Sequence, residues 1–258
     1  MTTAADHALA HDLAERAGHL LLDLRANGGD PDRLKNAGDR SSHEFLMAEL
    51  AKARPADAIL SEEGVDDKAR LTADRVWIVD PLDGTREFGE PGRVDWAVHV
   101  ALWERRAKGA SDGALTAGAV ALPAQGKVLS TSDEVAQRPD AVDAPLRMVV
   151  SRTRPSQLVK DVAKLLSAEL VPCGSAGAKA ATVIEGASDV YLHSGGFYEW
   201  DTAAPVAVAR AYGLHVSRVD GAEITYNRDN PLLPDILVCR SAIAGLLLNA
   251  IREATHAI

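Results

Sequence analysis

The sequence predicts an α+β half followed by an α/β half. Two amphipathic helical patterns come first, and short apolar runs separated by polar turns follow them, which indicates helices beside a meandering sheet. After residue 145, strand-like and helix-like segments alternate, as in an α/β unit. We therefore expect an N-terminal domain over residues 1–145 and a C-terminal domain over 146–258. The boundary should lie in the segment Asp133–Pro145, which is rich in Asp, Ala and Pro and lacks periodicity.

Both helices at the start of the chain are predicted from apolar spacings of three and four. The first pattern runs over residues 9–24 and stops at Asn27-Gly28-Gly29, a typical helix end. The second covers Ser41–Ala53, and Asp39 and Ser41 are candidates for its N-cap. These two helices should cover one face of the sheet that follows.

Apolar runs and renewed helical spacing predict the remaining elements. Strands of the first sheet are expected at 58–60, 76–79, 96–103, 118–122 and 127–130. In the second half, strands are expected at 146–150, 190–192, 214–216 and 235–239, and helices at 155–168, 177–185, 201–212 and 242–254. The chain shows no internal repeat and no low-complexity tract.

Composition excludes several classes of protein. The 258 residues are 47% hydrophobic, yet no apolar run approaches the length of a membrane span, so we expect no membrane association. The net charge of −9 and the lack of a long basic run argue against polymeric nucleic acid as a partner. No signal or transit peptide is visible, so a cytoplasmic location is expected. Cys173 and Cys239 are far apart in sequence and are expected to be buried thiols.

One acidic segment stands out in this composition. Asp80 and Asp83 flank a Pro-Leu pair after the apolar strand 75–79, so both carboxylates should face one small volume. Pro81 should stop the strand, and Gly84 permits a close approach of a ligand to the backbone. Two carboxylates held this close repel unless a proton or a hard cation lies between them, and Mg²⁺ prefers such oxygen ligands. The spacing by itself also fits a capped helix start or a solvated loop.

Two further acidic segments favour the metal interpretation. Ser61-Glu62-Glu63-Gly64 follows the strand at 58–60, although alone it would be typical of a solvated turn. Asp201 opens an Ala-rich helix, where it could be an ordinary N-cap, a metal ligand or both. Together the three segments predict a metal site at the ends of two strands and a helix.

These segments, in this order, resemble the inositol monophosphatase family of metal-dependent, lithium-sensitive phosphatases. Residues 77–85, Trp-Ile-Val-Asp-Pro-Leu-Asp-Gly-Thr, are similar to the family's first signature, and residues 200–204, Trp-Asp-Thr-Ala-Ala, are similar to its second. The resemblance covers about residues 39–213. It implies a layered αβαβα sandwich.

The resemblance also implies a set of metal ligands. Glu62, Asp80 and the carbonyl of Leu82 would bind a first Mg²⁺, while Asp80, Asp83 and Asp201 would bind a second. Two such ions can activate a water and stabilise the leaving alkoxide of a phosphomonoester.

By the same resemblance, other residues of the segment act on water and phosphate. Thr85 would orient the attacking water, with Asp39 as its acidic partner and a contact of a third, weaker metal. The usual Pro-Val-Thr lead into that acid is replaced by Lys35-Asn36-Ala37-Gly38, which leaves capping of the second helix as an alternative for Asp39. The N–H groups of Gly84 and Thr85 should donate to the phosphate.

The residues that follow the first signature favour one branch of the family. Residues 83–88, Asp-Gly-Thr-Arg-Glu-Phe, resemble the Gly-Thr-Lys-Glu-Phe form of the 3′-phosphoadenosine 5′-phosphate phosphatases, the CysQ group of sulfate assimilation. Lys179 aligns with a lysine of that branch and is a candidate for the second phosphate, with surface solvation as its alternative. Arg152 is a second such candidate, Gly174 and Ser175 are candidates for sugar contacts, and Asp201 would also face the substrate. His99 and His193 lack ligand-like spacing and are interpreted as structural.

The resulting hypothesis is Mg²⁺-dependent hydrolysis of the 3′-phosphate of 3′-phosphoadenosine 5′-phosphate, extending to its sulfated analogue. Its partner would be a small phosphorylated nucleotide, and the chain would act as a monomer or homodimer. Inositol 1-phosphate or fructose 1,6-bisphosphate is the alternative substrate within the same chemistry. A non-catalytic regulator that binds metal and phosphorylated ligands is the alternative of another class.

Overall fold

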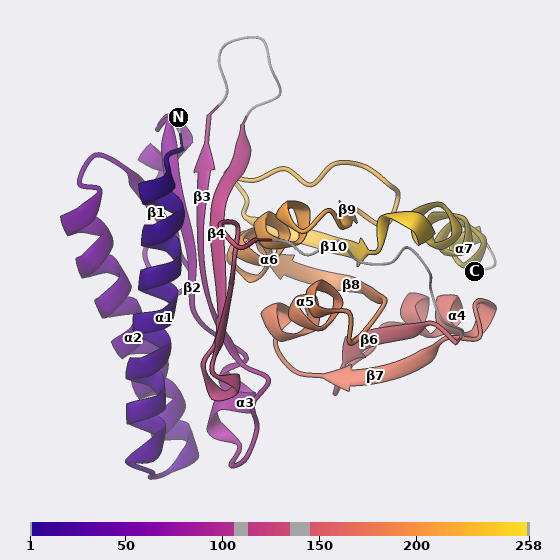
Figure 1. Cartoon of the computed structure of the whole chain (residues 1–258), viewed down its shortest axis with the longest axis horizontal. Helices are drawn as coiled ribbons and strands as arrows, with labels where there is room; N and C mark the ends of the chain where they lie inside the picture. Colours follow the sequence, from indigo (N-terminus) through magenta and orange to yellow (C-terminus); the bar gives the residue numbers. More distant parts are fainter. Residues whose placement is uncertain (1, 106–112, 135–144, 257–258) are drawn as a thin grey trace.

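The computed structural model describes residues 2–105, 113–134 and 145–256, and most of the predicted domain boundary, residues 135–144, lies outside this part of the chain. Five layers succeed one another, as Figure 1 shows: a pair of helices, a sheet, a second pair of helices, a second sheet and a third pair of helices. Separate apolar cores lie on the two faces of each sheet, and the central core joins both sheets. This order confirms the expected αβαβα sandwich.

The first helical layer consists of α1 (Ala4–Ala26) and α2 (Pro31–Ala53). The helix α2 begins ten residues earlier than predicted, because the carboxylate of Asp30 accepts hydrogen bonds from the N–H groups of Asp32 and Arg33, and Pro31 occupies the first turn. Asp39 and Ser41 therefore lie inside the helix, and neither of these two candidates is its N-cap.

The first sheet contains five strands among the described residues, in the order β1-β2-β3-β4-β5. Their bounds are β1 Ala58–Ser61, β2 Arg75–Asp83, β3 Ala97–Glu104, β4 Ala114–Leu122 and β5 Lys127–Ser130. The strand β1 is parallel to β2, and the other neighbours are antiparallel, which confirms the predicted meander.

The strand β2 does not stop at Pro81, contrary to prediction. Asp80 pairs with His99 and Asp83 pairs with Ala97, so three steps along β2 match two along β3. This bulge accommodates a proline that cannot donate to the ladder, and it redirects the side chains that follow.

The second sheet also contains five described strands, in the order β7-β6-β8-β10-β9. Their bounds are β6 Arg147–Ser151, β7 Glu169–Cys173, β8 Val190–Tyr198, β9 His215–Ser217 and β10 Leu232–Cys239. The strand β7 was not predicted, because it is a largely exposed edge strand that carries Pro172 and shows little apolar pattern. The strand β8 continues six residues past its predicted end at Leu192, directly into the next helix.

Helices of the second half fill the middle and outer layers. Between the sheets lie α5 (Ala176–Glu185) and α6 (Glu199–Ala211), while α4 (Gln157–Leu165) and α7 (Ala244–His256) cover the outer face (Figure 1). Gly118 of β4 allows α6 to approach, since a Cβ there would lie 2.9 Å from the Cβ of Ala207. This close packing brings the start of α6 beside the first sheet.

Short helices and the thiols complete the described fold. The helix α3 (Thr85–Gly89) follows β2 directly, and 3₁₀ turns cover Lys68–Leu71, Pro123–Gln125 and Ser241–Ile243. Both cysteines carry free thiols, as predicted, with Cys239 buried and Cys173 half-buried. Across the described ranges, no helix combines the length and the apolar character that crossing a bilayer requires.

Candidate metal centre

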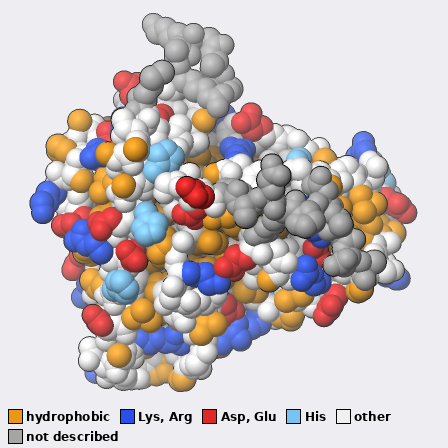
Figure 2. Space-filling view, viewed as in Figure 1, with side chains coloured by type: hydrophobic (Ala, Val, Ile, Leu, Met, Phe, Trp, Pro, Cys, Tyr) orange, Lys and Arg blue, Asp and Glu red, His pale blue; other side chains and the backbone are white. Residues whose placement is uncertain are grey.

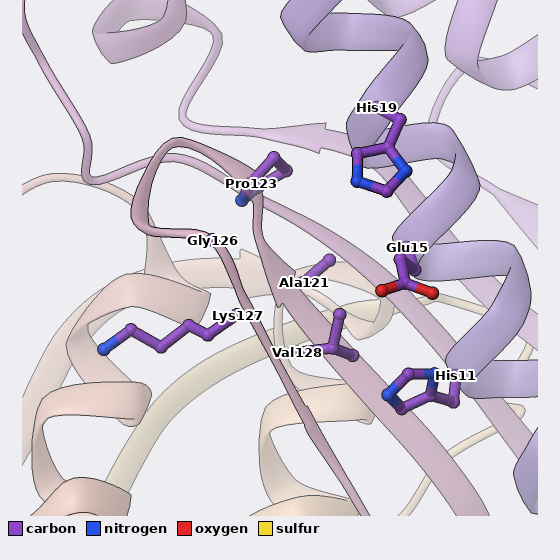
Figure 3. A pocket seen from close by; sticks show the side chains of 8 residues that line it. All are labelled: His11, Glu15, His19, Ala121, Pro123, Gly126, Lys127 and Val128. Carbon is purple, nitrogen blue, oxygen red and sulfur yellow. The ribbon is translucent and has the colours of Figure 1, made fainter.

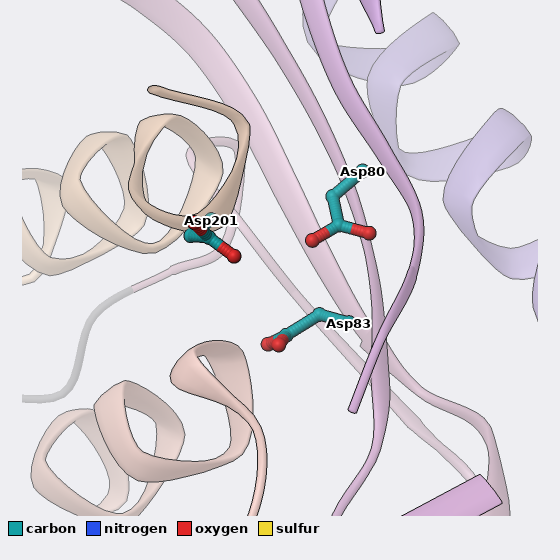
Figure 4. Close-up of side chains that lie close together, drawn as sticks. All are labelled: Asp80, Asp83 and Asp201. Atoms are coloured by element: carbon teal, nitrogen blue, oxygen red, sulfur yellow. The ribbon is translucent and has the colours of Figure 1, made fainter. Parts of the chain in front are cut away.

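Three carboxylates from distant parts of the sequence meet between the first sheet and the middle helices. Asp80, Asp83 and Asp201 each present an oxygen atom, and these atoms lie within 4.8 Å of one another. Figure 4 shows the first two projecting from β2 and the third from the start of α6, all toward the same space. Such a group of buried oxygen atoms suits a hard divalent cation.

The carboxylate of Asp83 is held by the start of α5. The hydroxyl of Ser175 and the N–H of Gly177 donate to its Oδ2 over 2.5 and 2.6 Å. The Nε2 atom of His99 lies 3.3 Å from the same oxygen, although its geometry is not that of a hydrogen bond. Burial raises the pKa of Asp83, but His99, Lys179 and Ser175 outweigh burial and hold this pKa well below its ordinary value.

The carboxylate of Asp80 is in a different state. Its Oδ1 accepts the N–H of Leu82 over 3.0 Å, but its Oδ2 is buried and has no hydrogen-bond partner within the described chain. Burial, followed by the charges of Glu62, Asp83 and Asp201, raises the pKa of Asp80 well above its ordinary value. A buried oxygen without a partner is costly, and a cation bound at this point would satisfy it.

Burial and the neighbouring negative charges also raise the pKa values of two more carboxylates. Burial, then repulsion from Asp83, raises the pKa of Asp201 to about 6, although the N–H of Tyr198 donates to it over 2.6 Å. Asp201 is the third residue of α6, so it is not the N-cap that the sequence suggested as one alternative. Glu62 follows β1 at the exposed rim, and desolvation of its carboxyl group, then Asp201, raises its pKa to about 7. The charges of Asp201 and Asp83 thus act on Glu62, while the group of close carboxylate oxygens consists of Asp80, Asp83 and Asp201.

The hydroxyl of Thr85 lies beside this group, at the first residue of α3. It is 3.3 Å from Oδ1 of Asp39 and 3.1 Å from the carbonyl oxygen of Leu82, and it can donate to either. Burial, then the charge of Glu63, raises the pKa of Asp39 to about 6. The structure therefore pairs Asp39 with Thr85 across 46 residues of sequence.

Gly84 is the left-handed turn between β2 and α3, with φ of 83°. A Cβ there would lie 3.0 Å from the Cβ of Ser175 and 3.4 Å from the carbonyl oxygen of Asp95. Glycine is therefore required both by the backbone conformation and by the close approach of α5.

A cavity of about 290 Å³ opens next to this turn. The predicted substrate residues all line it except Asp201, and the lining residues are Gly84, Thr85, Arg86, Glu87, Ser151, Arg152, Thr153, Arg154, Cys173, Gly174, Ser175 and Lys179. Lys179 is only 6% exposed, so the alternative of surface solvation is wrong. The cavity therefore places most of the predicted substrate residues beside the carboxylates.

Sequence reasoning missed three residues that support the site. His99 was interpreted as structural because it has no ligand-like spacing, yet it is fully buried beside Asp80 and Asp83. Asp95 accepts the N–H of Gly174 over 2.6 Å, and Glu87 accepts from Arg152 over 2.7 Å. The signals available were the alternation of β3, which faces His99 inward, and the unusual density of acids after residue 80.

Other surface features lie away from these residues. Figure 2 shows acidic and basic side chains interspersed on one face, with histidine side chains spaced along the side that α1 covers. A smaller pocket of about 140 Å³ there is lined by His11, Glu15 and His19 of α1 and by residues near the turn between β4 and β5 (Figure 3). It contains none of the predicted site residues.

Comparison with known proteins identifies a family of phosphatases, in agreement with the group of carboxylates. The model of the inositol monophosphatase family matches residues 3–256. The chain belongs to the inositol monophosphatase family. A curated relative in this comparison, the 3′-phosphoadenosine 5′-phosphate phosphatase of Mycobacterium leprae, is 50% identical over 254 residues, which cover 96% of this chain and 94% of the relative.

Solved structures of the family share the fold. Inositol monophosphatase II of Staphylococcus aureus superposes with a TM-score of 0.82 at 19% identity and covers 98% of both chains. CysQ of Bacteroides thetaiotaomicron superposes with a TM-score of 0.75 at 27% identity and covers 92% of this chain and 97% of that one. The five layers described above are therefore those of the family.

Proposed function

We propose that this protein is a Mg²⁺-dependent phosphomonoesterase that hydrolyses the 3′-phosphate of 3′-phosphoadenosine 5′-phosphate to AMP and inorganic phosphate. The observation that carries the chemistry is the convergence of Asp80, Asp83 and Asp201 around a buried Asp80 oxygen that has no partner in the described chain. Three carboxylates in one small volume accommodate a hard cation far better than an organic ligand. The sulfated analogue, which carries the same 3′-phosphate, is a second expected substrate.

The residues that would hold Mg²⁺ are Asp80, Asp83, Asp201, Glu62 and the carbonyl of Leu82, with two ions and a third, weaker one at Asp39. When bound, Mg²⁺ neutralises phosphate charge, lowers the pKa of a water and stabilises the departing alkoxide. The oxygen Oδ2 of Asp83 is already occupied by Ser175 and Gly177, so this carboxylate has its Oδ1 left for a cation. The Oδ2 of Asp80 has no hydrogen-bond partner among the residues that the structure describes.

The role of Thr85 follows from its hydrogen bonds. Because its O–H points toward Asp39 and Leu82, its oxygen lone pairs are left to accept a proton of a water molecule and so to orient that water. The first N–H groups of a helix have no partner within it, so Gly84 and Thr85, where α3 begins, can donate to phosphate oxygens. Gly174 and Ser175 line the same cavity and are candidates for contacts to the ribose.

The choice of substrate is supported by the relatives. The M. leprae protein, named a 3′-phosphoadenosine 5′-phosphate phosphatase, covers nearly the whole chain at 50% identity. Residues 84–87 of the segment Asp83–Phe88, which resembles the CysQ group, line the cavity beside the carboxylates. A cytoplasmic location and a monomeric or homodimeric state remain predictions.

Release of phosphate with Mg²⁺ tests this function. We expect kcat/KM for 3′-phosphoadenosine 5′-phosphate to exceed that for inositol 1-phosphate and for fructose 1,6-bisphosphate. A preference for either sugar phosphate would overturn the proposed substrate but would leave the proposed phosphomonoesterase reaction in place. Absence of phosphate release from all three, with Mg²⁺ binding intact, would instead favour a non-catalytic regulator.

A further inference from the structure

The cavity beside the carboxylates is rich in basic side chains. Among its lining residues are Arg86, Arg152, Arg154 and Lys179, against a single acid, Glu87. The chain as a whole is acidic, so this concentration of positive charge is local. Which of the four cations remain available for a ligand depends on the partners that each already has.

Carboxylates engage Arg152 through two of its guanidinium nitrogens. Its Nη2 donates to Oε1 of Glu87 over 2.7 Å and to Oε1 of Glu90 over 2.9 Å, and its Nε is 3.2 Å from the same Glu87 oxygen. Glu87 is only 6% exposed, so its charge needs this partner. A ligand that drew Arg152 away would leave a buried carboxylate without its counter-ion.

Lys179 is engaged by the backbone. Its ammonium donates to the carbonyl of Gly174 over 3.1 Å and to that of Ser175 over 2.5 Å, and it lies over the ring of Tyr191. Ser175 has a positive φ of 43°, and these bonds help to hold that strained turn in place. The side chain therefore supports the loop that grips Asp83.

Arg86 and Arg154 are exposed, and neither forms an ion pair with a carboxylate within the described residues. Arg86 reaches Oγ1 of Thr153 at 3.4 Å, so the α3 side and the β6–α4 loop face one another across the cavity. Hydroxyls of Ser151 and Thr153 lie in the same lining. The two guanidinium groups and these hydroxyls are donors that suit a phosphate.

We infer that Arg86 and Arg154 bind the second phosphate of a substrate whose first phosphate lies at the carboxylate centre, and that Arg152 and Lys179 position the walls of this subsite. This deepens the proposed function and rests on it. In a nucleoside 3′,5′-bisphosphate both phosphates are attached to one ribose, so the second must bind within the span of one sugar from the first. The cavity meets this condition because Arg86 directly follows Thr85 in sequence and in α3.

The test compares two substrates that differ only in the 5′-phosphate, 3′-phosphoadenosine 5′-phosphate and adenosine 3′-monophosphate. In Arg86→Met and Arg154→Met, the ratio of kcat/KM for the first substrate over the second should fall by about 10- to 100-fold, as expected for loss of a charge-assisted hydrogen bond. The loss should lie mainly in KM. Arg86→Lys should fall between wild type and Arg86→Met, because a lysine keeps the charge and loses the planar pair of donors.

Arg252→Met is the matched control and should leave the ratio unchanged. Arg252 is an exposed residue of α7, which is distant from the cavity residues in sequence and belongs to the outer helical layer. An unchanged ratio in both Arg86→Met and Arg154→Met, with wild-type turnover of the bisphosphate, would overturn the subsite and spare the proposed function.

Failure of the proposed function is recognised separately, as a lack of bisphosphate turnover by the wild-type protein. In that case calorimetry with AMP and adenosine still tests the subsite. A preference of wild type for AMP that both variants lose supports it, and equal binding of AMP and adenosine to wild type overturns it.

Discussion

The carboxylate centre and the basic cavity lie next to each other but differ in charge, in burial and in the elements that carry their residues. Asp80 and Asp83 of the centre are almost fully buried and project from a sheet strand, whereas Arg86 and Arg154 of the cavity are exposed on a short helix and a loop. A hard cation demands ligands at fixed positions, and strands in a packed sheet supply them. Recognition of a phosphate tolerates solvated arginines, whose charged groups stay in water. We therefore expect changes in the centre to act on kcat and changes in the cavity to act on KM.

The largest effect is expected for Asp80→Asn. Loss of an outer partner of a metal ligand typically costs 10- to 100-fold, so loss of a shared ligand should lower kcat by more than about 100-fold. Because the substitution removes a repelled charge, it should also raise the melting temperature of the metal-free protein. Asp6→Asn removes a buried carboxylate that pairs with Arg54 and Arg75 far from the site. This substitution should instead lower the melting temperature. Turnover close to wild type in Asp80→Asn would exclude Asp80 as a metal ligand.

Ser175→Ala should have the next largest effect. It removes the hydroxyl that holds Asp83 and that caps α5 by accepting the N–H of Ala178 over 3.0 Å. We expect kcat to fall by about 10- to 100-fold and the free energy of unfolding to fall by about 1 kcal/mol. Ser156→Ala, which removes the cap of α4, is the control: it should cost stability alone. Equal kcat values for the two variants would mean that Ser175 only caps its helix.

Lys179→Met distinguishes support of the loop from binding of substrate. Loss of two hydrogen bonds from a charged donor should lower the free energy of unfolding by about 1.5–3 kcal/mol. The kcat/KM values for 3′-phosphoadenosine 5′-phosphate and adenosine 3′-monophosphate should fall together. A rise in KM confined to the bisphosphate would show that Lys179 binds the second phosphate after all. Lys164→Met, on the exposed face of α4, controls for the change of residue type.

The smallest expected effect is a dependence of stability on pH and Mg²⁺. In the metal-free protein the pKa values of Asp201 and Glu62 are raised to about 6 and about 7 from ordinary values of 3.8 and 4.5. The folded state then binds protons more tightly than the unfolded state, so this contribution is fully present below about pH 4 and is lost as the pH rises to about 7. Mg²⁺, as the proposed cation, would replace those protons. The gain in melting temperature on adding Mg²⁺ should be small at pH 5 and reach a few degrees at pH 8.

In Asp201→Asn, the Mg²⁺-dependent gain in melting temperature should increase less between pH 5 and pH 8 than it does in the wild-type protein. A gain that is equal at pH 5 and pH 8 in the wild-type protein would mean that these carboxylates do not take up Mg²⁺ in place of protons.

The sequence by itself determined most of the fold and the identity of the acids. Apolar spacing located α1 and the strands of the first sheet, and the order of the three acidic segments indicated a metal site before any contact was known. Local pattern failed at α2, where Asp30 and Pro31 start the helix early, and at β7, a largely exposed edge strand with little apolar pattern. The domain division at residue 145 remains a prediction.

Only the tertiary structure decided which of these residues meet and what state each is in. The bulge in β2 and the packing of α6 on Gly118 bring Asp201 to Asp80, although 121 residues separate them in sequence. His99 and the cations of the cavity could not be sorted beforehand, because burial, backbone bonds and ion pairs decide whether a charge is available. Spacing along the chain reports which groups are present, whereas the field around a charge depends on neighbours from other elements, and these are known only in the folded protein.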